Sequence, residues 1–426
     1  MTIAINPVAG SAQTKNFGFS SLAAAIDQID FAALARDFQY APNDGVAVQL
    51  DLRGLPATLA FQQDSTALLF RMPGLKLARD AQGTGGTADF VIFNGLDRAD
   101  SIRLLKNFLK NNRYALKAIL TALARRSAID PLAGNPLSLM TQKMKTDFRD
   151  GFTHKVSQIW GCGTTAFNFS NDAPIMVAAL GATGDIFADA QRRAAEMRAG
   201  NQFGIGLGYT SAEADGYHST GIDLPMSYTA NLDRLPGHKL RFDLPLAYVD
   251  TEGASTYSVG LGVAYTYPIS EVWTLTPGVG VGATGSEDLG SAGGVGSFSV
   301  TSAYTWRVGD YALSMGNSVG KYDSLPIKIA DIQAEADVKN VVYTNGLLLS
   351  GPNSLIARNL VMELSIQDTR LSGDAVYSQV YDEVGVALGY INTDMGIISS
   401  YFKGGVSYLA GENNIRALKL NLSARF

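Results

Sequence analysis

From about residue 200 to the end of the chain, apolar residues alternate with small or polar ones. The segment FGIGLGYT (residues 203–210) puts Phe, Ile, Leu and Tyr on one side and glycine on the other, and the terminal LKLNLSARF (residues 418–426) repeats the pattern. A period of two is that of a β-strand, whose successive side chains point to opposite faces. About twelve such segments of ~9–12 residues follow one another, the length that a tilted strand needs to cross a bilayer. The segment at residues 332–349 breaks register around 341–343, which predicts a bulge or two shorter strands.

The chemistry of the two faces favours a membrane barrel over a water-soluble sandwich. One face is apolar with aromatic residues near the strand ends, where interfacial girdles lie, and the other is made of Gly, Ser, Thr and charges. The aromatics are Tyr209, Tyr228, Tyr248, Tyr265, Tyr267, Trp273, Tyr304, Trp306, Tyr390 and Tyr408. The 45 glycines of the chain concentrate in this half, and no apolar run reaches the ~20 residues of a transmembrane helix.

The connections between these segments predict the orientation of the barrel. Long connections are expected at SAEADGYHST (211–220), GSEDLGSAGG (285–294) and KYDSLPIKIAD (321–331), and short ones at PISE (268–271) and VGD (308–310). Because outer-membrane barrels have short periplasmic turns and longer external loops, the first strand should run outward. With an even number of strands, the last strand closes the barrel against the first and Phe426 lies at the periplasmic end.

Residues 183–426 resemble the translocator domain of autotransporters. The resemblance rests on the helix-like GDIFADAQRRAAEMRAG (184–200), the first strand at 203–210 and the terminal LKLNLSARF. It implies a twelve-stranded barrel with a helix in its lumen, and a terminal aromatic, Phe426, that the barrel-insertion machinery recognises. Residues 1–180 show no short β-helix repeat, so the chain resembles a short, solitary relative rather than an exporter of a long passenger.

The residues themselves also predict a helix inside the lumen. Glycine lets another backbone approach closely, and glycines line the inward face of the first strand and of its later neighbours. We expect the helix at 184–200 to pack there and its charges to pair with charged luminal residues. The expected contact residues are Arg192, Arg193, Glu196 and Arg198 on the helix, with Gly204, Gly206, Gly208, Lys239, Arg241 and Asp243 on the wall. In the alternative, the helix stays in the periplasm and the glycines only narrow the lumen.

Residues 1–180 predict a separate α+β domain. A helix is expected at 20–38 with Ser20 or Ser21 as its N-cap, followed by strands at 46–52, 57–63, 66–72 and 89–93. A basic stretch at 97–127 predicts two helices that break at Asn111–Asn112, and another helix follows Pro136. The basic residues can contact phosphates or anionic lipid headgroups, or form a solvated helix face; they are Arg98, Arg103, Lys106, Lys110, Arg113, Lys117, Arg125 and Arg126.

The sequence offers one weak catalytic candidate, His218 with Ser219. Lipid hydrolases of the outer membrane resemble it in using His and Ser on a barrel, but they space the two residues two apart, on one face of a strand. Here the residues are adjacent, no third orienting residue is evident, and we expect no enzyme. Cys162 and His154 are expected to pack, and Asn171–Asp172, which resembles an autotransporter self-cleavage site, precedes the helix instead of lying in the lumen.

No cofactor, metal or nucleic-acid partner is expected. The glycine runs lack the strand and helix context of nucleotide-binding loops, and the net charge of −5 does not call for nucleic acid. The expected surroundings are outer-membrane lipid and the insertion machinery, with any signal peptide outside this numbering.

Three functions are open at this stage. The first is an outer-membrane barrel that anchors or displays domain 1–180 at the cell surface through the helix 183–200 and the barrel 201–426. The second is a porin-like transport barrel with a periplasmic N-terminal domain. The third is a surface lipid hydrolase. The sequence does not name the partner of the N-terminal domain.

Overall fold

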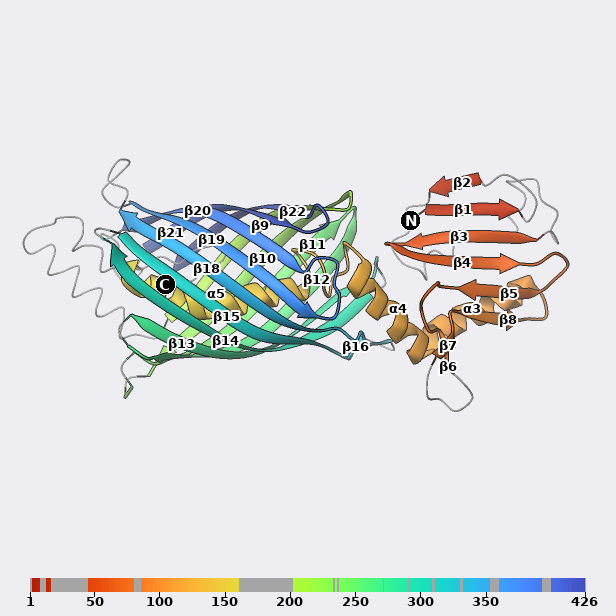
Figure 1. Cartoon of the computed structure of the whole chain (residues 1–426), viewed down its shortest axis with the longest axis horizontal. Helices are drawn as coiled ribbons and strands as arrows, with labels where there is room; N and C mark the ends of the chain where they lie inside the picture. Colours follow the sequence, from red (N-terminus) through yellow and green to blue (C-terminus); the bar gives the residue numbers. More distant parts are fainter. Residues whose placement is uncertain are drawn as a thin grey trace, which may run out of the picture.

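The computed structural model comprises a barrel and a smaller domain at one of its ends (Figure 1). It describes residues 2–7, 13–16, 45–79, 86–160 and 202–425, except 233, 236, 271, 290, 309–310, 330–331, 353–359 and 393–399. The helices expected at 20–38 and 184–200 and the terminal Phe426 lie outside these ranges.

Twelve antiparallel strands of the described chain close into the barrel. Its strands are β9 (Gln202–Ala214), β10 (Tyr217–Asn231), β11 (Lys239–Thr251), β12 (Ala254–Pro268), β13 (Trp273–Ser286), β14 (Ser291–Val308), β15 (Tyr311–Leu325), β18 (Lys339–Pro352), β19 (Leu360–Gly373), β20 (Val380–Asn392), β21 (Ser400–Gly411) and β22 (Arg416–Arg425). The last strand pairs with the first, with Leu422 opposite Leu207. The sequence prediction of a twelve-stranded barrel closed by its terminal strand is confirmed.

The two faces of the wall follow the period-two pattern. In β22, Leu418, Leu420 and Leu422 are 49%, 47% and 63% exposed on the outside, whereas Lys419 between them is 1% exposed on the inside. Outward aromatics lie near strand ends on other strands, among them Tyr209, Tyr228, Tyr267, Trp273, Tyr304 and Tyr408. An apolar exterior around a polar interior, with no open strand edge, is the surface of a barrel that spans the outer membrane.

The predicted alternation of long and short connections is wrong at the first hairpin. SAEADGYHST is continuous strand on both sides of a turn at Asp215 and Gly216, whose φ angles are 51° and 77°. Asp and Gly tolerate positive φ, so the chain reverses at once and the flanking residues stay paired. GSEDLGSAGG is also mostly strand, since β13 runs to Ser286 and β14 starts at Ser291. The orientation therefore cannot be taken from loop length.

The longest described excursion lies between β15 and β18. It forms a small hairpin of β16 (Ile327–Ile329) and β17 (Ile332–Ala334) outside the barrel sheet. Residues 332–349 do fall into two strands, β17 and β18, but the predicted position of the break is wrong: residues 341–343 pair in unbroken register within β18, and the strands separate between Ala334 and Lys339.

The described part of the N-terminal domain has a six-stranded sheet in the order β2-β1-β3-β4-β5-β8 and the helices α3 and α4. Its elements are β1 (Thr2–Pro7), β2 (Gln13–Asn16), β3 (Val46–Leu52), β4 (Leu55–Phe61), β5 (Ala67–Arg71), β8 (Phe90–Asn94), α3 (Arg98–Asn111) and α4 (Arg113–Arg126), with a hairpin of β6 (Ala78–Arg79) and β7 (Gly86–Ala88) beside the sheet. The predicted break between the basic helices is confirmed, because Asn112 ends α3 and its side chain caps α4 through Ala115 N. Leu59, Phe70 and Leu105 belong to the core shared by sheet and helices.

Candidate functional site

A helix occupies the lumen of the barrel. It is α5 (Leu139–Trp160), the helix expected after Pro136, and it packs against β12, β13, β14, β15 and β18 (Figure 1). Its first residue, Leu139, lies at Gly282 near the hairpin end of β13, while Gly151 lies at Thr301, farther from the N-terminal domain. The chain thus enters the lumen at the end that carries the N-terminal domain and proceeds toward the other end.

Among the described helices, none is both long enough and apolar enough to cross a bilayer.

A buried segment, residues 127–138, seals the mouth between α4 and α5. Asp130 organises it, because its carboxylate accepts from Leu132 N at 2.9 Å and from Ser291 Oγ of β14 at 3.1 Å. Leu132 and Ala133 pack in one apolar cluster with the wall and Ile129 packs in a second. We call residues 127–138 the mouth segment; all of them are buried at the end of the lumen nearer the N-terminal domain.

Glycines on one side of the lumen make room for α5. A Cβ built on Gly280 would overlap the Lys143 side chain, and one on Gly316 would overlap the Phe152 ring. On Gly346 it would lie 2.9 Å from the Phe148 ring. A helix does pack closely against luminal glycines, as expected, and on this wall the helix is α5.

Charges hold the same helix on the other side. Arg241 of β11 lies 2.9 Å from the Asp243 carboxylate and 3.4 Å from Asp150 of α5, and Arg149 of α5 lies 3.4 Å from Asp243. All four side chains are 8% exposed or less. Two guanidiniums and two carboxylates thus form one neutral cluster that joins α5 to the wall.

Further ion pairs line the lumen along α5 and around it. Within α5, Lys143 pairs with Asp147, and Tyr322 of β15 donates to the same carboxylate at 3.0 Å. On the wall, Lys419 pairs with Glu383, and Lys403 pairs with Glu363. The closed lumen is therefore highly charged, with opposite charges in contact.

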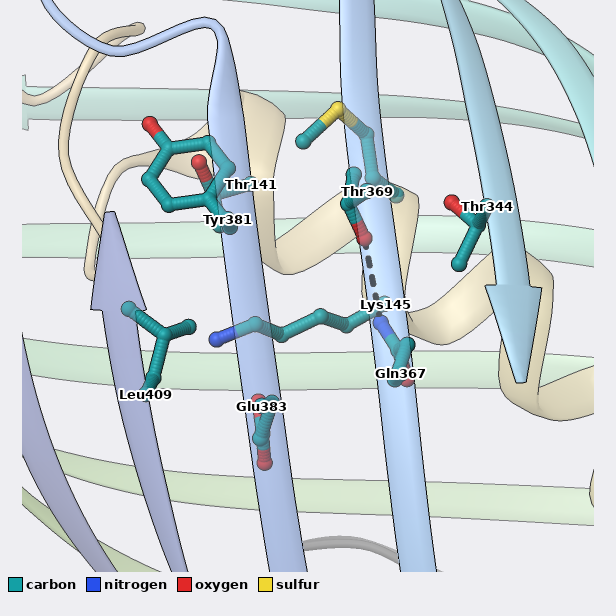
Figure 2. A pocket seen from close by; sticks show the side chains of 9 residues that line it. Thr141, Lys145, Thr344, Gln367, Thr369, Tyr381, Glu383 and Leu409 are labelled. Atoms are coloured by element: carbon teal, nitrogen blue, oxygen red, sulfur yellow. Dashed lines mark hydrogen bonds between the residues drawn. The ribbon is translucent and has the colours of Figure 1, made fainter. Parts of the chain in front are cut away.

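Two small cavities remain beside α5. The larger, about 60 Å³, lies toward β9, β10 and β22 and is lined by Lys145, Thr210, Asp223 and Lys419 among others. The smaller, about 10 Å³, is shown in Figure 2, where Lys145 reaches from α5 toward Glu383 on β20. A water needs roughly 10–15 Å³ of such space, so these two cavities among the described residues have room for a few waters only.

The structure can be compared with the predicted contacts one group at a time. Arg192, Arg193, Glu196 and Arg198 lie outside the described residues. Gly204, Gly206 and Gly208 face inward on β9, across the lumen from the strands that α5 packs against. Lys239, Arg241 and Asp243 are all buried on the inside, and the latter two contact α5.

Sequence reasoning missed the charged residues of α5. The signal was present in LMTQKMKTDFRDGF, where Lys143 and Asp147 are four residues apart and Arg149 and Asp150 follow within a stretch that also holds Met and Phe. A helix that mixes large apolar residues with both signs of charge matches a lumen whose wall does the same.

The catalytic candidate is not assembled as a pair. His218 and Ser219 lie in β10, not in an external loop as predicted, and adjacent strand positions point to opposite faces. Ser219 Oγ lies 2.8 Å from Thr251 Oγ1, and Glu252 accepts from the backbone of His218. The side chain of His154 and residues 161–201, with Cys162 and Asn171–Asp172, lie outside the described part. Within the described ranges, no group of three or more His, Cys, Asp or Glu is placed to hold a metal ion.

Part of the basic run docks the N-terminal domain onto the barrel. Lys117 pairs with Glu335, and Arg125 pairs with Asp374 at 2.7 Å while donating to the Asp337 carbonyl at 2.9 Å. Thr121 Oγ1 accepts from Asp337 N. A hydrogen bond from Lys339 lowers the pKa of the Asp337 carboxyl. These contacts fix α4 to the β15–β18 excursion.

Other basic residues bind within the domain. Arg98 donates to the Gln62 and Ser65 carbonyls and lies over the Phe61 ring, and Arg103 pairs with Asp100.

Comparison with known proteins gives structural likenesses. No protein-family model and no curated protein matches the sequence. Among solved structures, the β domain of the Bordetella autotransporter BrkA is similar with a TM-score of 0.41 and 12% identity, over 53% of this chain and 98% of that one. The translocator domain of the autotransporter NalP from Neisseria meningitidis gives 0.42 and 12%, over 57% and 98%. The KdgM porin gives 0.30 and 9%, over 52% and 99%.

Proposed function

We propose that this protein anchors its N-terminal α+β domain on the outer surface of the outer membrane and keeps its own barrel closed. One observation carries the proposal: the chain runs from the N-terminal domain through the mouth segment into the lumen along α5. The barrel strands then begin and end at the opposite end, where β9 starts and β22 finishes (Figure 1). The lumen thus holds the connection between the domain and the barrel.

We infer the orientation from where the first strand starts and the last strand finishes. The proposal places these two strand ends, which lie at the same end of the even-stranded barrel, in the periplasm, so that the other end is external. The N-terminal domain lies at that other end: Arg125 of α4 contacts Asp374 after β19, and Ile129 packs in one cluster with Ala214 and Tyr217 on either side of the β9–β10 turn. This arrangement favours display at the surface over a periplasmic adaptor.

The filled lumen argues against a transport barrel. The mouth segment is buried among wall residues, α5 runs below it, and the larger remaining cavity is about 60 Å³. A porin-like solute passage needs a continuous aqueous channel, so α5 and the mouth segment would both have to leave.

In this proposal, the N-terminal domain stays docked on the outer end of the barrel. Ion pairs at Lys117 and Arg125 and the buried mouth segment hold it against the barrel. Outer-membrane lipid then surrounds the barrel, and the barrel-insertion machinery is the partner that assembles the barrel. No catalytic role is included.

Site-specific labelling on intact cells tests the proposal. In a Cys162→Ser background, Leu96→Cys places a thiol in the N-terminal domain, where Leu96 is 95% exposed. Leu235→Cys places a matched thiol at the opposite end, in the β10–β11 connection, where Leu235 is 47% exposed. A membrane-impermeant maleimide should label Leu96→Cys on intact cells, and Leu235→Cys only after the outer membrane is permeabilised.

The reverse labelling pattern would overturn display and support a periplasmic N-terminal domain. Planar-bilayer conductance supplies the second arm. We expect near-zero conductance for the intact chain; steady, porin-like conductance would overturn the closed lumen even if the labelling succeeds.

A further inference from the structure

A row of polar side chains interrupts the apolar outside of the barrel on β14, β15, β18 and β19. The strand register places Ser302, Asn317, Asn345 and Asp368 opposite one another in that order. We call these four residues the polar row. The exposed outward neighbours along the strands are Met315 and Val319 beside Asn317, Tyr343 and Leu347 beside Asn345, and Ile366 and Arg370 beside Asp368.

Each end of the polar row has a polar partner on the outside of the barrel. At one end, Ser302 accepts from Trp273 Nε1 at 2.8 Å, and Trp273 is the first residue of β13, where an aromatic girdle lies. At the other end, Asp368 pairs with Arg370 at 3.1 Å, close to the end of β19 nearer the N-terminal domain. With neighbouring strands about 4.8 Å apart and tilted by about 40°, the row changes depth by only about 10 Å across its four strands, less than the apolar band of about 25 Å.

Along β15, Asn317 lies between the exposed residues Met315 and Val319, and along β18, Asn345 lies between Tyr343 and Leu347. These flanking residues place the two asparagines in the apolar band of the wall. Asn317 Nδ2 donates to Asn345 Oδ1 at 2.7 Å, and both side chains are exposed. A primary amide carries two N–H donors and a carbonyl with two lone pairs. This bond leaves both N–H groups of Asn345 and the carbonyl of Asn317 directed away from any partner in the described chain. Lipid cannot satisfy these groups, and leaving them unpaired there is costly.

We propose that the polar row is a membrane-embedded interface with a second copy of this chain, centred on Asn317 and Asn345. Two copies related by an axis along the membrane normal meet at equal depth, so the amide pair of one faces the amide pair of the other. Amides are self-complementary because each both donates and accepts, and a lipid headgroup does not reach this depth. Met315 and Leu347 supply the apolar packing around the amides.

Disulfide trapping in native membranes tests this proposal. In the Cys162→Ser background, Asn317→Cys should form a crosslinked species of twice the chain mass under mild oxidation. The matched control is Leu420→Cys on β22, whose side chain is 47% exposed on another part of the wall. We expect at least about tenfold less crosslinked dimer for this control.

Replacing both amides tests whether they are needed for dimer formation and not for folding. The Asn317→Leu/Asn345→Leu double variant should keep a folded, heat-resistant barrel and lower dimer formation in vesicles by roughly tenfold, as expected when membrane-embedded amide hydrogen bonds are lost. Single-molecule photobleaching counts the copies. Equal trapping at positions 317 and 420, or dimer formation unchanged in the double variant, would overturn the proposal. A crosslinked species of any mass other than twice the chain would overturn the second copy as the occupant.

Discussion

The two sides of the lumen hold the same helix by different means. Toward β12–β18, glycines bring the wall so close to α5 that Lys143, Phe148 and Phe152 fill the positions of absent side chains. Toward β9–β11 and β20–β22, charges face one another and a cavity of about 60 Å³ remains. On the glycine side, stability depends on the volume of the side chains that pack there. On the charged side, stability depends on the balance of opposite charges, and there is room for water. The difference predicts which substitutions each side tolerates.

The largest effect should come from unbalancing the charged cluster. Asp243→Ala removes the carboxylate between Arg149 and Arg241, and breaking such a buried arrangement costs about 3–5 kcal/mol. We expect a loss of unfolding free energy of that order, measured by urea unfolding in vesicles. The Arg241→Met/Asp243→Leu double variant keeps the charge balanced and should lose clearly less. If the single and double variants were equally destabilised, volume and not charge would govern this side.

The next effect should come from filling the glycine wall. In Gly316→Ala the new Cβ overlaps Phe152, and overpacking of this kind costs about 1–3 kcal/mol. Gly404→Ala in β21 is the matched control, because its Cβ would meet Leu422 at an ordinary 3.5 Å. The same unfolding assay should separate the two. An unchanged stability for Gly316→Ala would show that α5 does not press on this wall.

These two regions also differ in how far the sequence predicts them. The wall is predictable because alternation fixes which face each residue takes, as Lys419 between Leu418 and Leu420 shows. The terminal strand must close the sheet in lipid, so its partner follows as well. The loop prediction failed at Asp215–Gly216, where composition suggested a loop and turn chemistry gave a hairpin.

The identity of the luminal helix is less predictable, because both its shape and its charges have to fit the wall. Glycines such as Gly280 indicate that something packs inside, yet they do not say which charged helix does so. The sequence analysis assigned that role to residues 184–200, and the structure places Lys143 of α5 against Gly280. The ion pair between Arg149 and Asp243, which are far apart in sequence, likewise joins α5 to the wall, and such a pairing is visible only in the folded chain.

A smaller effect should follow from filling the cavity side. Thr210→Ile adds one heavy atom at a residue that lines the larger cavity. Because space is present there, the change should cost less than about 1 kcal/mol, below the range for methylenes added to a well-packed core. Comparison with Gly316→Ala in the same assay tests the asymmetry of the lumen directly. A loss as large as that of Gly316→Ala would mean that both sides are equally packed.

The smallest effect should come from the same ion-pair chemistry outside the lumen. Arg125 and Asp374 are 36% and 30% exposed, so water screens their attraction, and such pairs contribute about 0–1 kcal/mol. Arg125→Ala should leave barrel unfolding unchanged and increase hydrogen exchange in α4, because it loosens the docked domain only. Exposed Arg126 supplies the control, and Arg126→Ala should change neither quantity. A barrel destabilised by Arg125→Ala as strongly as by Asp243→Ala would mean that docking and plug form one cooperative unit. If only α4 loses protection from hydrogen exchange, the N-terminal domain and the barrel unfold as separate units that meet at the mouth segment. The stability contributed by an ion pair then depends on how deeply the pair is buried and not on which charged residues form it.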